Sequence, residues 1–188
     1  MEQEDLMRDT RKIHVAADHA GFEYKESVRE WLISEGYEVI DHGAYDYEED
    51  DDYPDFVAPA ANAISREDDT SVRAIIFGGS GQGEAIVANR FPNVRAVVFN
   101  GQYVPADGRE VPEEIVTARN HNDANVLSLG ARFLSLTEVK EAVELFLETE
   151  FSGEVRHVRR IEKIGGVFRY IQAQDMSDQE PEDKDLNW

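Results

Sequence analysis

The stretch from Ile75 to Asn89 contains the residues best suited to chemistry in this sequence. An apolar, β-branched run passes into four glycines within six residues, and a helix-like spacing of small and apolar residues follows. A strand, a glycine loop and a helix start form an anion site, because glycines let the backbone approach a ligand and the first helical N–H groups point at it. The loop ends at Glu84, which places a carboxylate beside these donors. This combination indicates a general base next to an oxyanion hole.

Three known loop motifs do not fit this stretch. A P-loop ends in Gly-Lys-Ser/Thr, but Glu84 follows Gly83 here. A nucleophile elbow requires Gly-x-Ser-x-Gly, but Gln82 occupies the last position. The dinucleotide motif needs a third glycine where Glu84 stands, and it follows a first strand, whereas this loop follows the third expected strand. A plain strand-to-helix turn with an exposed glutamate is the alternative.

Length and composition limit the class of protein. The 188 residues fit one domain with a hydrophobic core, and the lack of cysteine excludes disulfides, thiolate metal sites and a cysteine nucleophile. We expect a cytoplasmic protein without a membrane partner, because no apolar run is long enough to span a bilayer and the N-terminus lacks the apolar core of a signal peptide. The net charge of −21 makes nucleic acid a poor partner, so an anionic metabolite requires positive groups gathered locally.

Five expected strands alternate with helices, which predicts an α/β, three-layer Rossmann-like fold with a doubly wound parallel sheet. The expected strands span residues 12–17, 38–41, 72–77, 95–99 and 125–129. Helices are expected over residues 21–36, 56–65, 84–90, 113–119, 137–149 (capped by Thr137) and 154–164. The acidic run in residues 45–54 indicates a solvated loop. We expect a disordered arm at residues 1–11, the functional domain at 12–164 and an acidic tail at 165–188.

Polar residues follow the strands at the edge where parallel sheets bind ligands. Asp18 and His19 follow the first strand, and Tyr47 lies in the loop after the second. Arg132 follows the fifth strand, and His121 with Asn122 lies just before it. An alternative role for Asp18 is to cap the following helix.

The expected helix over residues 154–164 is basic although the chain is acidic. Arg156 and Arg160 are four residues apart, so they share a helix face. Paired arginines bind phosphate through forked, charge-assisted hydrogen bonds, although such a face can also pair with the protein's own carboxylates. Together with a histidine, a carboxylate base and an oxyanion cradle, the pair indicates a proton-transfer site for a sugar phosphate.

Seven motifs occur in the order found in the ribose-5-phosphate isomerase B family. They are ADHAG at 17–21, DDYP at 51–54, GGSGQGE at 78–84, AN at 88–89, NHN at 120–122, GAR at 130–132 and RHVRR at 156–160. The chain resembles this family, which also contains allose- and galactose-6-phosphate isomerases, from about residue 12 to residue 164.

The resemblance implies aldose–ketose isomerisation through a cis-enediolate. We expect no metal or other cofactor, because the N–H groups of the glycine loop can take the role of a metal. Many members have a cysteine base where this chain has Gly78. The chain resembles the branch in which a glutamate after the glycine loop moves the proton, which implies Glu84 as the base. The resemblance also implies that Ser80 and loop N–H groups stabilise the enediolate oxygen. The loop residues implied in substrate binding are Gly79, Gly81, Gln82 and Gly83.

The resemblance assigns the remaining site residues. It implies ring opening by His121 with Asp18, and sugar contacts by Tyr47 and Asn122. The phosphate contacts that it implies are His19, Arg132, Arg156 and Arg160. It also implies a homodimer, or a dimer of dimers, with shared sites in which the C-terminal arginines come from the neighbouring chain.

Three hypotheses follow for the activity. The first is interconversion of ribose 5-phosphate and ribulose 5-phosphate. The second is isomerisation of a six-carbon sugar phosphate, since the segment 101–112 is longer than the family pattern predicts and can reshape the sugar pocket. The third is a sugar-phosphate sensor without catalytic activity.

Overall fold

The computed structural model describes residues 11–177, and side chains as far as residue 166. The expected arm, except Arg11, and the end of the expected tail lie outside the described residues. The chain forms two compact units, residues 1–152 and residues 153–188, and each is described by itself. Within the described part of the chain, no helix combines the length and the apolar character needed to cross a membrane.

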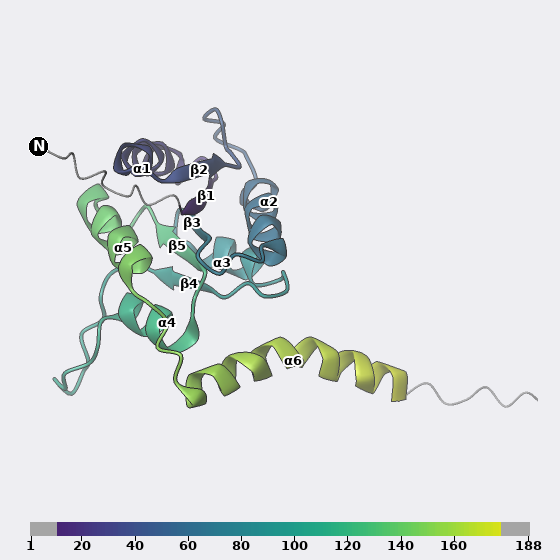
Figure 1. The fold of residues 1–188 in the computed structure, drawn as a ribbon. Helices are drawn as coiled ribbons and strands as arrows, with labels where there is room; N and C mark the ends of the chain where they lie inside the picture. The colour runs from purple at the N-terminus through teal and green to yellow at the C-terminus, as the bar shows by residue number, and fades with distance from the viewer. Residues whose placement is uncertain (1–10, 178–188) are drawn as a thin grey trace, which may run out of the picture. The chain divides into compact units, whose positions relative to one another are not determined.

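The first unit is built on a five-stranded parallel sheet with the order β2-β1-β3-β5-β4 (Figure 1). Its strands are β1 (Lys12–Ala17), β2 (Glu38–Asp41), β3 (Arg73–Gly78), β4 (Ala96–Phe99) and β5 (Val126–Gly130). Phe77 pairs with Ala17 on one side and with Leu129 on the other. The carboxyl ends of the three central strands therefore lie side by side, and the loops that follow them leave the same edge of the sheet.

Helices cover both faces of this sheet, as the sequence predicts. They are α1 (Phe22–Glu35), α2 (Tyr53–Arg66), α3 (Gln82–Ala88), α4 (Glu114–Asn122) and α5 (Leu136–Glu148). Successive strand residues point to opposite faces. Val15 packs in the core under α1, α4 and α5, whereas its neighbour Ala16 packs in the core under α2 and α3. The expected three-layer α/β fold is confirmed.

Some helix ends differ from the expectations by a few residues. The Ser135 hydroxyl accepts a hydrogen bond from the backbone N–H of Glu138, and the Glu138 carboxylate accepts one from the N–H of Ser135, so Ser135 rather than Thr137 caps α5. α2 begins at Tyr53, three residues earlier than expected, which places Pro59 inside the helix. α4 continues through Asn122, so the NHN motif forms its last turn.

The second unit consists of α6 (Val155–Ser177) as far as it is described, a longer helix than expected. Arg156 and Arg160 lie one turn apart on it, and both are exposed. Arg156 also pairs with the carboxylate of Glu154 at 2.8 Å. The shared helix face predicted for the two arginines is therefore present.

Candidate active site

The carboxyl ends of β1 and β3 form a topological switch point. β2 lies on one side of β1, whereas β5 and β4 continue the sheet beyond β3. Open α/β sheets bind ligands in the crevice at such a point. Asp18 and His19 leave β1 there, and the glycine loop leaves β3. The fold thus brings two of the predicted motifs together.

Glu84 lies in the first turn of α3 and is 4% exposed, so the alternative of an exposed turn glutamate is wrong. A Cβ atom added to Gly78 would lie 1.8 Å from a carboxylate oxygen of Glu84. The carboxyl group thus fills the space that a side chain at residue 78 would occupy. Burial raises the pKa of Glu84 above its usual value, and the negative charge of Asp18 raises it further.

Asp18 contributes both to local structure and to the charge of the site. Its Oδ1 accepts hydrogen bonds from the N–H groups of Ala20 (3.0 Å) and Gly21 (3.2 Å), so it closes the turn that leads into α1. The capping role that the sequence left open is therefore present. The side chain is also buried, which raises the pKa of Asp18. Two carboxyl groups with raised pKa values, Asp18 and Glu84, thus belong to the same crevice.

His19 is held by a residue that the sequence interpretation missed. The His19 backbone N–H donates to Asp51 Oδ1 at 2.9 Å, and His19 Nδ1 lies 2.7 Å from the same oxygen. The Asp51 side chain is 7% exposed, so the prediction that the whole acidic run is solvated is wrong at this residue. The signal available in the sequence was the place of Asp51 in the DDYP motif. Tyr47, itself exposed, meets the His19 ring edge-on at 6.4 Å between centroids.

The glycines of the loop make room for side chains as well as for a ligand. A Cβ atom on Gly79 would lie 2.9 Å from Cζ of Arg132, and one on Gly83 would lie 2.7 Å from Cζ of Tyr53. Gly81 has a φ of +72°, and its carbonyl accepts a hydrogen bond from the buried Ser128 hydroxyl at 2.7 Å. Only glycine fits such contacts and such a backbone without strain.

Backbone hydrogen bonds tie Arg132 and the loop together. The Arg132 N–H donates to the carbonyl of Gly79 at 3.2 Å. Within the loop, the Gln82 N–H donates to the Ser80 hydroxyl at 3.4 Å. Arg132 therefore lies over the loop from the end of β5, as its position in the sequence predicted.

Asn100 is a second residue that the sequence interpretation missed. It follows β4 and donates from Nδ2 to the carbonyl of Ser80 at 3.0 Å. A Cβ atom on Gly130 would lie 2.1 Å from Asn100 Oδ1, which is buried and has no hydrogen-bond partner among the described residues. The position of Asn100 directly after the expected strand 95–99 was the signal that could have identified it from the sequence. Through its hydrogen bond to Ser80, Asn100 helps to hold the glycine loop in place.

His121 and Asn122 lie at the opposite edge of the sheet within one chain. They form the last turn of α4, and helices of a parallel α/β sheet end near the amino ends of the strands. Arg95, directly before β4, donates from Nε to the carbonyls of Asn122 (3.1 Å) and Asp123 (2.8 Å). One copy of the chain therefore does not bring these two residues to Glu84.

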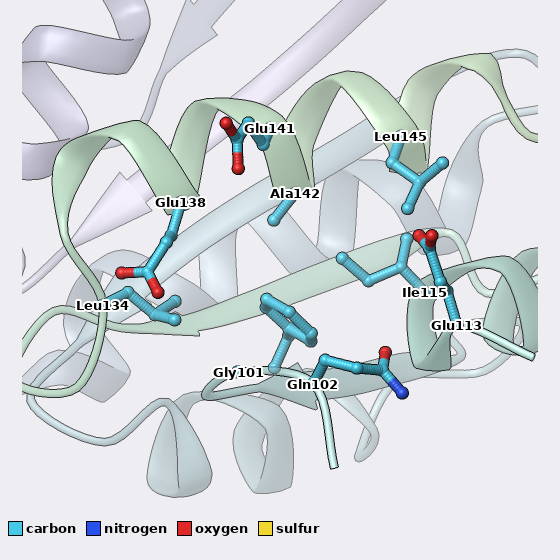
Figure 2. A pocket seen from close by; sticks show the side chains of 10 residues that line it. Gly101, Gln102, Glu113, Ile115, Leu134, Glu138, Glu141, Ala142 and Leu145 are labelled. Carbon is cyan, nitrogen blue, oxygen red and sulfur yellow. The ribbon is translucent and has the colours of Figure 1, made fainter. Parts of the chain in front are cut away.

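A separate hollow of about 320 Å³ lies beside the end of β4, between the start of α4 and the side of α5 (Figure 2). Phe99, Leu134 and Leu145 give it an apolar lining, and three carboxylates also line it, those of Glu113, Glu138 and Glu141. No basic side chain is among the residues that line this hollow. Its charge disfavours a phosphate, so the crevice above β1 and β3 is the better site for an anionic sugar.

One group of described residues has the ligand types for a metal ion. Asp18, His19 and Asp51 have potential ligand atoms that all lie within 4.8 Å of one another. The hydrogen bond between His19 and Asp51 accounts for much of this closeness. The same groups are suited to orient an imidazole for acid–base or phosphate chemistry.

The chain is similar to known proteins over most of its length. The sequence profile of the family described as Ribose/Galactose Isomerase matches residues 13–164. The ribose-5-phosphate isomerase B of Mycolicibacterium paratuberculosis is 35% identical over 162 residues, which cover 86% of this chain and 94% of that protein. The enzyme of the same name from Escherichia coli is 33% identical over 157 residues, 84% of this chain and 96% of that protein.

Solved structures share the fold and about a third of the sequence. Ribose-5-phosphate isomerase B of Clostridium thermocellum superimposes with a TM-score of 0.74 at 36% identity, covering 85% of this chain and 99% of that one. The Mycoplasma genitalium enzyme, solved with bound ribulose-5-phosphate, gives a TM-score of 0.72 at 33% identity, covering 86% of this chain and 96% of that one. The chain belongs to the ribose/galactose isomerase family and is an aldose–ketose isomerase.

Proposed function

We propose that this protein interconverts ribose 5-phosphate and ribulose 5-phosphate through a cis-enediolate, with Glu84 as the base. The observation that carries the proposal is the buried Glu84 carboxyl group, which fills the space above Gly78 at the switch point of the sheet. The relatives named as ribose-5-phosphate isomerase B, and the one solved with ribulose-5-phosphate, support this choice of substrate.

The proposed reaction moves one proton between two carbons. Glu84 takes the proton from C2 of the open-chain aldose, and the electrons of the C–H bond form the C1–C2 double bond while O1 becomes an oxyanion. The hydroxyl proton of O2 passes to O1, C2 becomes the carbonyl carbon, and Glu84 returns its proton to C1. Loop N–H groups of Gly79 and Gly81, with the Ser80 hydroxyl, stabilise the oxyanion. Such donors contribute about 2.7–4 kcal/mol each.

The charges around Glu84 suit this role. A general base works best when its pKa lies near the working pH, and burial together with Asp18 raises the pKa of Glu84 in that direction. Glu84 must be ionised to take the C2 proton, so turnover falls as the pH drops through its raised pKa. His19 and Arg132 provide positive charge in the same crevice, because the Arg132 charge acts on the pKa of His19. We assign the substrate phosphate to these two side chains, with Tyr47 beside the sugar.

We infer that a second copy of the chain completes the site. His121 and Asn122 are the residues proposed to open the sugar ring and contact the sugar, yet they lie at the sheet edge opposite Glu84 in their own chain. A homodimer can bring His121 of one copy to Glu84 of the other. We assign Arg156 and Arg160 to the same shared arrangement as further phosphate contacts.

Exchange of substrate hydrogen with solvent tests the base. Glu84→Gln keeps the size of the side chain but removes the base, so kcat is expected to fall by about 10²–10⁴ with the fold intact. Incorporation of deuterium from D₂O at C1 and C2 should fall with it, because no group takes up the proton. Glu30→Gln, at an exposed position of α1, is the matched control and should retain full activity. Full turnover in Glu84→Gln would contradict the assignment.

A six-carbon sugar phosphate is the second candidate substrate. The matching family is described by both ribose and galactose, and the segment 101–112 follows β4 at the carboxyl edge of the sheet. The ratio of kcat/KM for five-carbon and six-carbon aldose phosphates decides between them. A protein that binds these sugars but exchanges no hydrogen would contradict both.

A further inference from the structure

The contact between His19 and Asp51 joins two segments that are far apart in the sequence. His19 is the second residue after β1, whereas Asp51 is the second residue before α2. One oxygen, Asp51 Oδ1, meets both the backbone N–H of His19 (2.9 Å) and Nδ1 of its ring (2.7 Å). These two contacts fix the backbone and the ring of the same residue. Since Nδ1 faces Asp51, Nε2 is the ring nitrogen left for another partner.

The burial of the two residues is unequal. The Asp51 side chain is 7% exposed and that of His19 is 26% exposed. The second oxygen of Asp51, Oδ2, is buried without a hydrogen-bond partner among the described residues. A carboxylate held in this way is costly unless it interacts strongly with a positive group. The neighbouring Asp50 is exposed, so the acidic run itself does not explain the burial of Asp51.

We propose that Asp51 is a positioning residue, which holds the His19 imidazole in one orientation and in its doubly protonated form so that Nε2–H donates to the phosphate of the substrate. The inference rests on the proposed function, because it takes the phosphate to be the partner of His19. It adds a residue whose part in the reaction is indirect, through His19.

The charges that face His19 agree with this role. The hydrogen bond to Asp51 raises the pKa of His19, and the negative charges of Asp18 and Asp51 add to this effect. Partial burial and the nearby positive charge of Arg132 oppose it. Tyr47 contributes its ring edge to the imidazole. The result is a raised pKa, which keeps His19 positively charged to higher pH than an ordinary histidine.

A simple charge argument makes the opposite prediction for removal of Asp51. A carboxylate near a phosphate repels it, so Asp51→Asn would improve phosphate binding if Asp51 were only an acidic neighbour. If Asp51 holds His19 in its charged form, the same substitution weakens phosphate binding. The loss then grows as the pH rises, because the released His19 becomes neutral. The sign of the change in KM therefore separates the two roles.

The test compares Asp51→Asn with Asp50→Asn, which removes the same charge from an exposed neighbour. For Asp51→Asn, KM at pH 8 is expected to rise about tenfold, the effect of losing one charge-assisted hydrogen bond. The rise should be smaller at pH 6, and kcat should change less than about threefold. Asp50→Asn should leave KM and its pH profile unchanged. Asp51→Glu should restore part of the affinity. A lower KM in Asp51→Asn, or an equal change in Asp50→Asn, would overturn the proposal.

Two further measurements separate this inference from the proposed function. NMR titration of His19 in the ligand-free protein should give a pKa above the ordinary value in the wild type and a lower one in Asp51→Asn. An unchanged His19 titration overturns the inference whatever the activity of the protein. In a His19→Asn background, Asp51→Asn should cause no further rise in KM, because Asp51 acts through His19. A further rise would show a direct role and overturn the proposal. Absence of any sugar-phosphate exchange in the wild type would instead contradict the proposed function.

Discussion

Gly78 and Glu84 occupy complementary spaces, and this pairing is the most specific feature of the site at the level of single residues. The glycine provides no side chain, and the carboxyl group of Glu84 lies where one would be. The atom that would collide with a new Cβ is the far end of a flexible side chain. If Glu84 is the base, we therefore expect catalysis to be more sensitive than folding to the size of residue 78.

Gly78→Ala is expected to displace the Glu84 carboxyl group and to lower kcat by about 10² or more, since the base then no longer lies in its productive position. The melting temperature should change by only a few degrees, because Glu84 can rotate away. Gly21→Ala provides the contrast. Its Cβ would lie 2.8 Å from a backbone carbon of Phe77, which cannot move aside, and about 1–3 kcal/mol of stability should be lost. Steady-state kinetics and thermal denaturation of both variants check the prediction; equal loss of stability in the two would contradict it.

The arrangement of strands and helices explains which parts of the site were predictable. Apolar runs and helix-like spacings predicted the five strands and the helices between them to within a few residues. The rule that ligands bind at the carboxyl ends of parallel strands then located Asp18, His19 and the glycine loop. The same rule did not locate His121, because a helix returns the chain to the other edge before β5. Asp51 was missed for another reason: its neighbours in sequence are solvated acids, and its burial depends on a contact with His19 across the fold. The DDYP motif marked this segment, but nothing in the local sequence shows that Asp51 contacts His19.

β1 and the residue after β2 are also joined by a pair of histidines outside the site, of which His14 is buried and His42 is half-buried. Nδ1 of His14 lies 2.8 Å from Nε2 of His42, and the rings stack at 5.0 Å between centroids. One nitrogen must donate and the other must accept, so the accepting ring must be neutral and the two rings cannot both be protonated. Burial, together with His42 and Lys12, lowers the pKa of His14 to about 4, whereas Glu67 opposes this shift. Burial also lowers the pKa of His42, which Asp41 opposes.

This histidine pair predicts a loss of stability in mild acid. Because the pKa of His14 is lower in the folded protein than in the unfolded chain, its contribution is fully present above about pH 6.5 and is lost as the pH falls toward 4. When the pH is lowered from 8 to 5, the loss of this contribution should reduce the free energy of unfolding by about 2 kcal/mol. His14→Asn should remove this part of the pH dependence, while the opposite contributions of Asp18 and Glu84 stay common to both proteins. Urea denaturation at pH 8 and pH 5 measures the difference, and equal slopes in the two proteins would refute it.

Because the whole molecule is strongly acidic, the positions of its basic residues decide where an anionic substrate can bind. A net charge of −21 repels a sugar phosphate at long range, so binding depends on positive groups close to the phosphate. One chain offers His19 and Arg132 at the crevice, and α6 carries Arg156 and Arg160. A shared site would combine these groups from two copies and concentrate positive charge where each chain alone has little.

Mixed dimers test this arrangement directly. Glu84→Gln and His121→Ala should each be nearly inactive alone, but a dimer of one copy of each has one site with both Glu84 and His121 intact. If the copies assort at random, half of the dimers are mixed, and each mixed dimer has one intact site and one defective site. Co-expression should therefore restore about a quarter of wild-type activity. Glu84→Gln with Asp18→Asn is the matched control. Glu84 and Asp18 lie in the same crevice of one chain, so under the proposed arrangement every mixed dimer has two defective sites and no activity should return. Recovery in the control pair, or none in the first pair, would rule out a site shared in this way.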